Sequence, residues 1–380
     1  MQWRFTMRPM HDAVLLQLID TVRAAAGRGT PLRIRGGGTK DFLGQLPVGE
    51  LLHMGALAGI VSYEPSELVV TVRAGTPLSE LEATLAAQGQ CLAFEPPRFG
   101  ADGTVGGMVA SGLSGPARAS VGAVRDYVLG VTLVNGRGEL LTFGGQVMKN
   151  VAGYDLSRLM AGAMGTLGVL VEVSLKVLPV APAEATLRFE ASQAEALRRL
   201  AAWGGQPLPL NASYWVDEPA GHGTLSVRLR GAVAAVDAAC RTMGGERQPG
   251  NAPSVDWSAC RDQRMPWFTG RDPTLSLWRL SVPKTAPVLE LPPGVAPPLV
   301  EWHGAQRWVI AAAAHGQALR RAAAAAGGSA SLFIAENDLS VLAMSRFEPL
   351  KPPLDRIHRR LKAEFDPAGI LNPGRLVAGL

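Results

Sequence analysis

The chain has 380 residues, 47% of them hydrophobic, and a formal net charge of +5. This length predicts more than one domain, each with a core of its own. The positive excess is thin and is not gathered into one block, which argues against a nucleic-acid-binding protein.

The cysteine content is low. Cys91, Cys240 and Cys260 include no Cys-x-x-Cys pair, so we expect no iron–sulfur or zinc framework built by this chain. We interpret the three as small buried hydrophobes in a reducing compartment. No apolar run reaches the roughly 18 residues that span a bilayer. We therefore expect a cytoplasmic protein.

Helical and strand patterns alternate over the first 180 residues. Apolar residues at helical or alternating spacing predict a helix over 11–26 and strands over 32–35, 60–64, 68–73, 129–134, 139–143 and 169–177. We place strands 129–134 and 139–143 in a second lobe.

Turn and cap residues support these elements. Asn135-Gly136 is a hairpin signal between two of the strands. Thr76 is expected to cap a helix that begins at Pro77, where the missing N–H has no cost. Gly89 is expected to end that helix.

The residue composition changes after residue 182, where glycine motifs stop and tryptophan becomes frequent. The elements expected beyond this point are a strand over 225–230, a helix over 232–243, a proline-rich loop over 283–299 and a helix over 355–364. No internal repeat is evident in the sequence.

A triple glycine follows the strand at 32–35. Gly36, Gly37 and Gly38 can curl so that successive backbone N–H groups point inward and bind phosphate oxygens. Arg35 or Lys40 can add positive charge. A flexible turn is the alternative interpretation. The loop is not a Rossmann fingerprint, because its glycine spacing is different.

Two further glycine-rich stretches carry the same type of signal. In 96–112, N–H groups near Gly106 and Gly107 can meet a ring edge or a pyrophosphate; a tightly packed turn is the alternative. In 162–168, glycines recur every third residue, which either lets the backbone approach a flat ring or reflects close helix-to-strand packing. Together the three stretches predict a pocket of bare backbone for a large anionic, aromatic cofactor.

These segments resemble the FAD-binding domain of the vanillyl-alcohol oxidase and p-cresol methylhydroxylase superfamily, and within it the FAD-binding subunits of bacterial glycolate oxidase. The resembling segments are 35–39, 103–115, 124–130, 149–177 and 366–375. With the overall length they cover essentially the whole chain, although the middle part matches only in texture.

The resemblance implies an α+β fold with three parts. These are a two-lobed FAD-binding domain over 1–182, an α+β cap domain over 183–335 that faces the substrate or a partner, and a C-terminal segment over 336–380 that returns to the FAD domain. In that family the first loop holds the pyrophosphate, the second and fourth segments line the isoalloxazine and ribityl chain, and the last segment braces the domain.

The resemblance also implies the cofactor and its contacts. Some relatives attach FAD through a histidine in the first loop; Thr39 stands there in this chain, so non-covalent FAD is expected. The residues implied at FAD are Arg35, Gly36, Gly37, Gly38, Thr39, Lys40, Pro96, Gly103, Thr104, Gly106, Gly107, Ser111, Gly112, Gly115, Arg125, Asp126, Lys149, Tyr154, Gly165, Thr166, Gly168, Val169 and Asn372.

The chain departs from the catalytic relatives at two places. They carry a histidine-rich metal motif in the cap, where this chain has only the isolated His222, and a glutamate where it has Met164. No metal site is expected, and no residue pattern singles out a catalytic base. Arg98 and Arg271 are candidates to bind a substrate carboxylate.

The function that the resemblance implies is an FAD-dependent oxidoreductase acting on CH–OH groups. The chain would be one subunit of a multi-subunit 2-hydroxyacid (glycolate) oxidase, beside a larger homologous FAD subunit and an iron–sulfur subunit. It would either oxidise glycolate to glyoxylate or relay the electrons, and would reach the inner membrane only peripherally, through partner subunits. The alternatives are a stand-alone flavin oxidase of another alcohol and a non-catalytic scaffold subunit.

Overall fold

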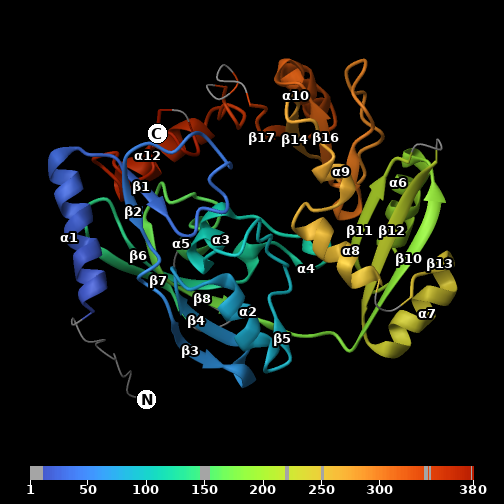
Figure 1. The fold of residues 1–380 in the computed structure, drawn as a ribbon, viewed down its shortest axis with the longest axis horizontal. Helices are drawn as coiled ribbons and strands as arrows, with labels where there is room; N and C mark the ends of the chain where they lie inside the picture. Colours follow the sequence, from blue (N-terminus) through green and yellow to red (C-terminus); the bar gives the residue numbers. More distant parts are fainter. Residues whose placement is uncertain are drawn as a thin grey trace.

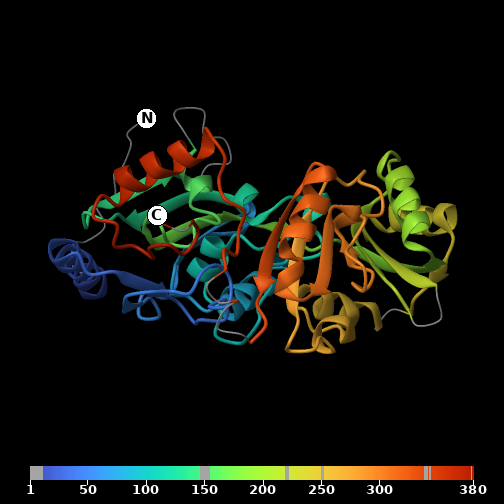
Figure 2. The same cartoon turned by 90° about the horizontal axis from the view of Figure 1, so that it is seen from above.

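The structure is a computed structural model that describes residues 12–145, 155–218, 222–249, 252–337, 341, 344–377, 379 and 380. Figure 1 shows two halves side by side: the N-terminal part, in blue to green, and the middle part, in yellow-green to orange. The last helix, α12 (Leu354–Phe365), lies against the N-terminal half in both ribbon views (Figures 1 and 2). The predicted domain limits at residues 182 and 335 stay a prediction.

A five-stranded antiparallel sheet forms the centre of the N-terminal half. Its strands, in spatial order, are β3 (Ile60–Glu64), β4 (Val69–Arg73), β8 (Val169–Lys176), β6 (Val128–Val134) and β7 (Leu140–Gly144). Strand β8 pairs with both β4 and β6, so the strands that the sequence had placed in separate lobes share one sheet. Helices α2 (Leu78–Ala86) and α3 (Val105–Ser111) bury their apolar side chains against it.

A smaller layer joins the two ends of the chain. Helix α1 (Ala13–Arg28) begins after Asp12, whose carboxylate accepts hydrogen bonds from two N–H groups of the first turn, and ends before Gly29 at φ 64°. It packs on β1 (Leu32–Arg35), which pairs in parallel with β2 (Glu50–His53). The tail residue Leu371 forms a parallel bridge with Leu32, so the C-terminal segment adds to this layer.

The predicted caps of α2 are wrong, although the helix itself is confirmed. The Thr76 hydroxyl donates to the Arg73 carbonyl at 2.7 Å and accepts from the Gly59 N–H at 2.9 Å, so it fastens a loop instead of capping the helix. The helix starts at Leu78 without a side-chain cap and ends at Ala86, before Gly89.

The predicted hairpin between β6 and β7 is confirmed, but its glycine has another reason. The Asn135 side chain accepts hydrogen bonds from the Arg137 and Glu139 N–H groups, and Gly138 supplies the positive φ of 73°. Gly136 instead donates its N–H to the Phe365 carbonyl at 2.8 Å. The glycine therefore makes room for the C-terminal segment.

An eight-stranded sheet forms the middle of the second half. Its strands, in spatial order, are β13 (Glu246–Arg247), β10 (Ala183–Ala191), β12 (Gly223–Gly231), β11 (Leu210–Val216), β15 (Leu299–Glu301), β16 (Gln306–Ala311), β14 (Ser276–Ser281) and β17 (Ser329–Ile334). The sheet consists of two sets of four strands that are consecutive in the sequence, β10–β13 and β14–β17. Counted along the chain, the first strand of each set lies between the fourth and the third, and the second strand lies next to the other set. The repeat is one of topology, and it has no evident counterpart in the sequence.

Helices cover one face of this sheet. They are α6 (Gln193–Gly204) and α7 (Val233–Met243) on the first set and α10 (Gly316–Ala325) on the second. Where the second set lacks a helix, the predicted loop over 283–299 crosses instead and buries Ala286 and Leu289 in the same core. The proline-rich loop of the second set therefore takes the place that helix α6 has in the first set.

The other face of the sheet turns toward the N-terminal half. Its buried Tyr214, Trp308 and Phe333 pack with Leu113 of the N-terminal half. Helices α8 (Ala252–Arg261) and α9 (Pro266–Thr269) complete this layer. The shorter elements are η1 (Pro65–Glu67), β5 (Gln90–Cys91), α4 (Arg118–Val121), η2 (Val124–Asp126), α5 (Leu156–Leu159), β9 (Leu178–Pro179), η3 (Trp302–Gly304) and η4 (Ala313–His315). Within the described ranges, no helix is long and apolar enough to cross a membrane.

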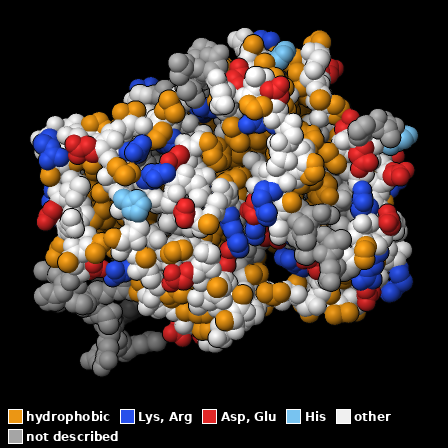
Figure 3. Space-filling view, in the orientation of Figure 1, with side chains coloured by type: hydrophobic (Ala, Val, Ile, Leu, Met, Phe, Trp, Pro, Cys, Tyr) orange, Lys and Arg blue, Asp and Glu red, His pale blue; other side chains and the backbone are white. Residues whose placement is uncertain are grey.

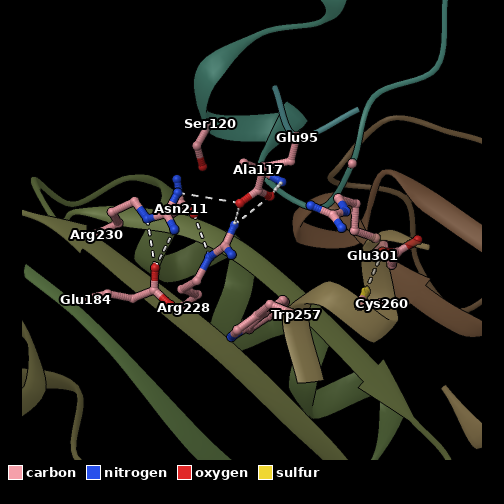
Figure 4. A network of polar contacts seen from close by, with 12 residues as sticks. Glu95, Ala117, Ser120, Glu184, Asn211, Arg228, Arg230, Trp257, Cys260 and Glu301 are labelled. Carbon is pink, nitrogen blue, oxygen red and sulfur yellow. Dashed lines mark hydrogen bonds and ion pairs between the residues drawn. The ribbon is translucent and has the colours of Figure 1, made fainter. Parts of the chain in front are cut away.

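A buried ion pair holds the two halves together (Figure 4). Both carboxylate oxygens of Glu95, in the N-terminal half, accept from Arg228 Nη2 at 2.7 Å. Arg228 is 3% exposed and Glu95 16%. Arg230 lies 3.5 Å from the same carboxylate, and the Arg228 guanidinium lies 4.9 Å from the centre of the Trp257 ring. The pair joins residues 133 positions apart in the sequence.

Candidate functional site

The main cleft lies in the N-terminal half, where three glycine-bearing segments meet the C-terminal tail. We call it the glycine-loop cleft. It is lined by Ile34, Arg35, Gly36, Gly37, Gly38, Thr39, Lys40, Asp41, Leu43, Met54, Ala74, Thr104, Gly106, Gly107, Ala110, Ser111, Met164, Gly165, Gly168, Leu170, Asn372 and Arg375. Its empty volume is about 810 Å³, part of it open to solvent, which is in the range of cofactor and ligand sites.

More than half of the predicted cofactor residues line this cleft. They are Arg35, Gly36, Gly37, Gly38, Thr39, Lys40, Thr104, Gly106, Gly107, Ser111, Gly165, Gly168 and Asn372. Residues far apart in the sequence thus come together in one cavity. Lys149 and Tyr154 lie outside the described residues.

The other predicted residues do not line this cleft, and Gly115 and Thr166 line other cavities. Those outside the lining are Pro96, Gly103, Gly112, Gly115, Arg125, Asp126, Thr166 and Val169. Asp126 accepts a hydrogen bond from the Ala123 N–H, and the Thr166 hydroxyl donates to the Ala163 carbonyl, so both side chains serve local turns. Their contact with a cofactor stays a prediction.

The loop after β1 presents unpaired backbone donors. From Gly36 to Lys40, none of the five N–H groups donates to an acceptor within the described part of the chain. Gly38 adopts a positive φ of 74°, which turns the chain sharply. Successive free N–H groups in such a turn form a concavity that binds phosphate oxygens. The observation fits the predicted role of this loop.

The predicted reason for the glycines needs correction. A Cβ at Gly37 would overlap the Asp102 carbonyl oxygen, and one at Gly106 would lie 2.7 Å from the Ala74 Cβ. At Gly168 it would lie 2.8 Å from Leu133. The missing side chains therefore allow the walls of the cleft to pack against one another. For Gly106 and Gly168 this is the alternative that the sequence left open, whereas for Gly37 the alternative was a flexible turn.

The N–H groups at the start of α3 are also not free. Gly106 donates to the Ala74 carbonyl at 2.7 Å, and Gly107 donates to the Thr104 hydroxyl at 3.2 Å. The expectation that these two groups point at a pyrophosphate or a ring edge is wrong, because the helix cap and the neighbouring strand already use them.

Lys40 supplies a positive charge in the wall of the cleft. Burial lowers its pKa to about 8, and the Asp262 carboxylate opposes that shift. Within the described ranges no carboxylate lies within ion-pair distance of its ammonium group. A buried cation without a direct partner is stabilised by an anion bound next to it.

The C-terminal tail holds the walls of the cleft in place. The Asn372 side chain accepts from the Ile34 N–H at 2.8 Å and donates to the Met164 carbonyl at 2.6 Å. Arg375 donates to the carbonyl groups of Gln45 and, at 2.9 Å, of Asp41. Arg375 was not among the predicted cofactor residues, because its partners are backbone carbonyls that leave no signal in the sequence.

The candidate carboxylate partners of the sequence are occupied elsewhere. Arg98 pairs with Glu82 at 2.5 Å, and Arg271 donates to the Leu275 carbonyl. His303 has hydrogen-bond contacts to Ser120 and Ser213, and burial lowers its pKa to about 4, so it is neutral at pH 7. Across the described residues, no cluster of His, Cys, Asp and Glu side chains has the makings of a metal site.

The comparisons with known proteins agree with this geometry. Residues 15–144 match a family model described as an FAD-binding domain. The chain is 44% identical to glycolate oxidase subunit GlcE of Escherichia coli over 96% of its own length and 97% of that protein. It is 32% identical to glycolate oxidase subunit GlcD of Bacillus subtilis, over 41% of this chain and 34% of that one.

More distant relatives match a part of the chain or share its fold. A D-lactate dehydrogenase of Anaerostipes hadrus is 35% identical over 34% of this chain and 27% of its own. A solved structure of alkyldihydroxyacetonephosphate synthase superposes with a TM-score of 0.64 at 16% identity, over 94% of this chain and 74% of that chain, and shows the fold alone.

The fold and the family match define an FAD-binding protein of the vanillyl-alcohol oxidase and p-cresol methylhydroxylase type, as the sequence predicted. FAD is its cofactor. Within that class, the chain belongs to the family of glycolate oxidase subunit GlcE.

Proposed function

We propose that this protein is the FAD-binding subunit of a multi-subunit 2-hydroxyacid oxidase whose substrate is glycolate. The observation that carries the proposal is the 44% identity to subunit GlcE over nearly the whole of both chains. A likeness of that extent includes both halves and the tail that completes the cleft, so it concerns the whole protein and not only its FAD domain.

The glycine-loop cleft is the proposed FAD site. The free N–H groups of 36–40 and the Lys40 ammonium would hold the pyrophosphate, since both supply what a dianionic group needs. Asn372 and Arg375 fix the loops on either side of it. FAD supplies an acceptor for two electrons when bound. Thr39, in the first loop, has no nucleophilic imidazole to offer, which supports a non-covalent cofactor.

The proposal includes partners. A larger homologous FAD subunit and an iron–sulfur subunit would complete the enzyme in the cytoplasm, or at the inner membrane through those partners. The partial likeness to subunit GlcD supports the first of them. In this arrangement the chain oxidises glycolate to glyoxylate or relays the electrons of that reaction.

Reconstitution tests the proposal. The tagged chain is purified from its native host, its co-purifying subunits are identified, and glycolate oxidation is assayed with and without them. We expect a yellow protein that gains glycolate-dependent dye reduction only in the complex. A colourless protein would indicate a scaffold subunit that binds no flavin. Full activity of the isolated chain would indicate a stand-alone oxidase. Either result would contradict the proposal.

A further inference from the structure

A second cavity lies where the two halves meet. We call it the junction cavity; its empty volume is about 360 Å³, part of it open to solvent, and its walls include Phe99, Gly115, Arg279, Glu301, Trp302 and Trp308. It shares no lining residue with the glycine-loop cleft. The two are nevertheless neighbours, because α3 lines the cleft and the residues that follow it, 113–116, line the junction cavity.

Arg279, on β14, brings an unpaired positive charge into this cavity. Its Nε donates to the Gln306 side chain at 3.0 Å, but neither terminal nitrogen donates to any acceptor that the structure describes. Burial, with a further contribution from Arg118, lowers its pKa to about 10, and the Glu301 carboxylate opposes that shift, so the group is charged at neutral pH. A buried guanidinium whose terminal nitrogens have no acceptor is costly unless a ligand supplies one.

The acidic side chain of the cavity, Glu301, attracts Arg279 through space but forms no hydrogen bond or ion pair with it among the contacts of the described residues. One carboxylate oxygen of Glu301 accepts from the Cys260 thiol at 2.9 Å, and the other accepts from the Trp308 indole N–H. Figure 4 shows the contact between Cys260 and Glu301, both in the second half, apart from the Glu95 ion pair. Glu301 is therefore held by its own donors and leaves both terminal nitrogens of Arg279 available.

A second cation strengthens the positive potential. The guanidinium groups of Arg118 and Arg279 lie 4.5 and 5.1 Å from the centre of the same Trp302 ring. Neither group has a carboxylate within ion-pair distance among the described residues. On the surface, Lys and Arg side chains near the middle of the molecule lie beside Asp and Glu side chains (Figure 3), so the positive potential comes from the two cations beside the Trp302 ring. The junction thus favours an anion.

The walls restrict the size of that anion. Phe99, Trp302, Trp308 and Phe333 surround the space, and Trp308 and Phe333 stack edge to face at 4.8 Å between ring centres. Aromatic walls exclude bulky ligands and lower the local dielectric, which strengthens an ion pair inside.

We propose that the junction cavity binds the carboxylate of a short hydroxy or keto acid, of two or three carbons, with Arg279 as its bidentate partner. The inference rests on the proposed function and deepens it: it places the substrate or product between the halves, next to the FAD cleft, on a residue that the sequence did not single out.

Binding measurements on the FAD-loaded full-length chain test this inference. Calorimetric titration with glycolate is compared with titration by glycolamide, which has the same shape without the charge. We expect wild-type protein to bind glycolate and not glycolamide. Arg279→Gln should weaken glycolate binding by roughly 10- to 150-fold, the worth of a charged hydrogen bond, and Arg279→Lys should weaken it less.

The control is Arg264→Gln, because that side chain is 63% exposed and lies outside the cavity; it should bind glycolate like the wild type. Equal binding of the two ligands by wild-type protein would overturn the inference without any variant, even if Arg279→Gln fails to fold. An Arg279→Gln protein that loses FAD but keeps glycolate would also overturn it and would assign the cavity to the cofactor.

Failure here is distinguishable from failure of the proposed function. If the reconstituted complex oxidises glycolate with an Arg279→Gln subunit at the normal KM, the inference fails and the proposed function stands. If the complex never forms but the isolated chain binds glycolate through Arg279, the proposed function fails and the inference stands.

Discussion

The glycine-loop cleft and the contact between the two halves are built from opposite materials. The cleft is a surface of backbone: its glycines pack against neighbouring main chain, and its loop offers free N–H groups. The contact between the halves consists of long charged and aromatic side chains, such as Glu95, Arg228 and Trp257. The first arrangement depends on exact backbone positions, and the second depends on pairs of side chains that satisfy each other.

The largest effect should come from breaking the ion pair between the halves. Glu95→Gln leaves Arg228 charged and buried without its partner, so the free energy of unfolding should fall by about 3–5 kcal/mol. Chemical denaturation measures it. Glu195→Gln is the matched control, because its pair with Arg199 is 36–38% exposed and follows helical spacing; it should cost about 0.3–0.5 kcal/mol. Equal losses of unfolding free energy in the two variants would show that the buried pair stabilises the protein no more than the exposed pair does.

A smaller but more specific effect is expected in the cleft. Gly37→Ala places a methyl group onto the Asp102 carbonyl, so the loop must shift, at a cost of about 1–3 kcal/mol in stability together with loss of FAD. Gly27→Ala, in α1 and outside the cleft, adds a methyl that would meet no atom within 4 Å and should keep both. Absorbance of the bound flavin and the melting temperature report the two outcomes. A Gly37→Ala protein with normal flavin content would refute the close-packing argument.

The smallest effect concerns the charge of Lys40. Only its protonated form would hold the pyrophosphate in the proposed FAD site, and its pKa without an anion is about 8. Affinity for FAD should therefore be constant below that value and fall as pH rises above it, by up to about tenfold per pH unit. Lys40→Arg, which stays charged, should remove the pH dependence. Fluorescence titration with FAD from pH 7 to 9.5 provides the measurement, and an unchanged slope in the variant would exclude Lys40 as the source.

Local features of the fold were predictable from the sequence because they depend on residues close together in the chain. The strand at 32–35 and the helix over 355–364 follow from apolar spacing alone. The repeated strand order of the second half did not, because it arises from pairings such as Tyr214 with Glu301 that no local pattern encodes.

The candidate site divides in the same way. Runs such as Gly36–Gly38 are visible in the sequence, so the loop that lines the cleft was found. The direction in which each glycine packs was not, because Asp102 and Ala74 become neighbours only through the fold. Arg279 and Trp302 carried no motif at all, and the two candidate arginines that the sequence offered, Arg98 and Arg271, are paired elsewhere.

The position of Asn372 and Arg375 has a consequence for how the protein is made. The ribosome synthesises the glycine loop after β1 early and the residues that fasten its surroundings some 330 positions later. Until then the loop has no anchor on that side. Loading of the flavin should therefore be a post-translational event, and nascent chains stalled before residue 372 should emerge without it.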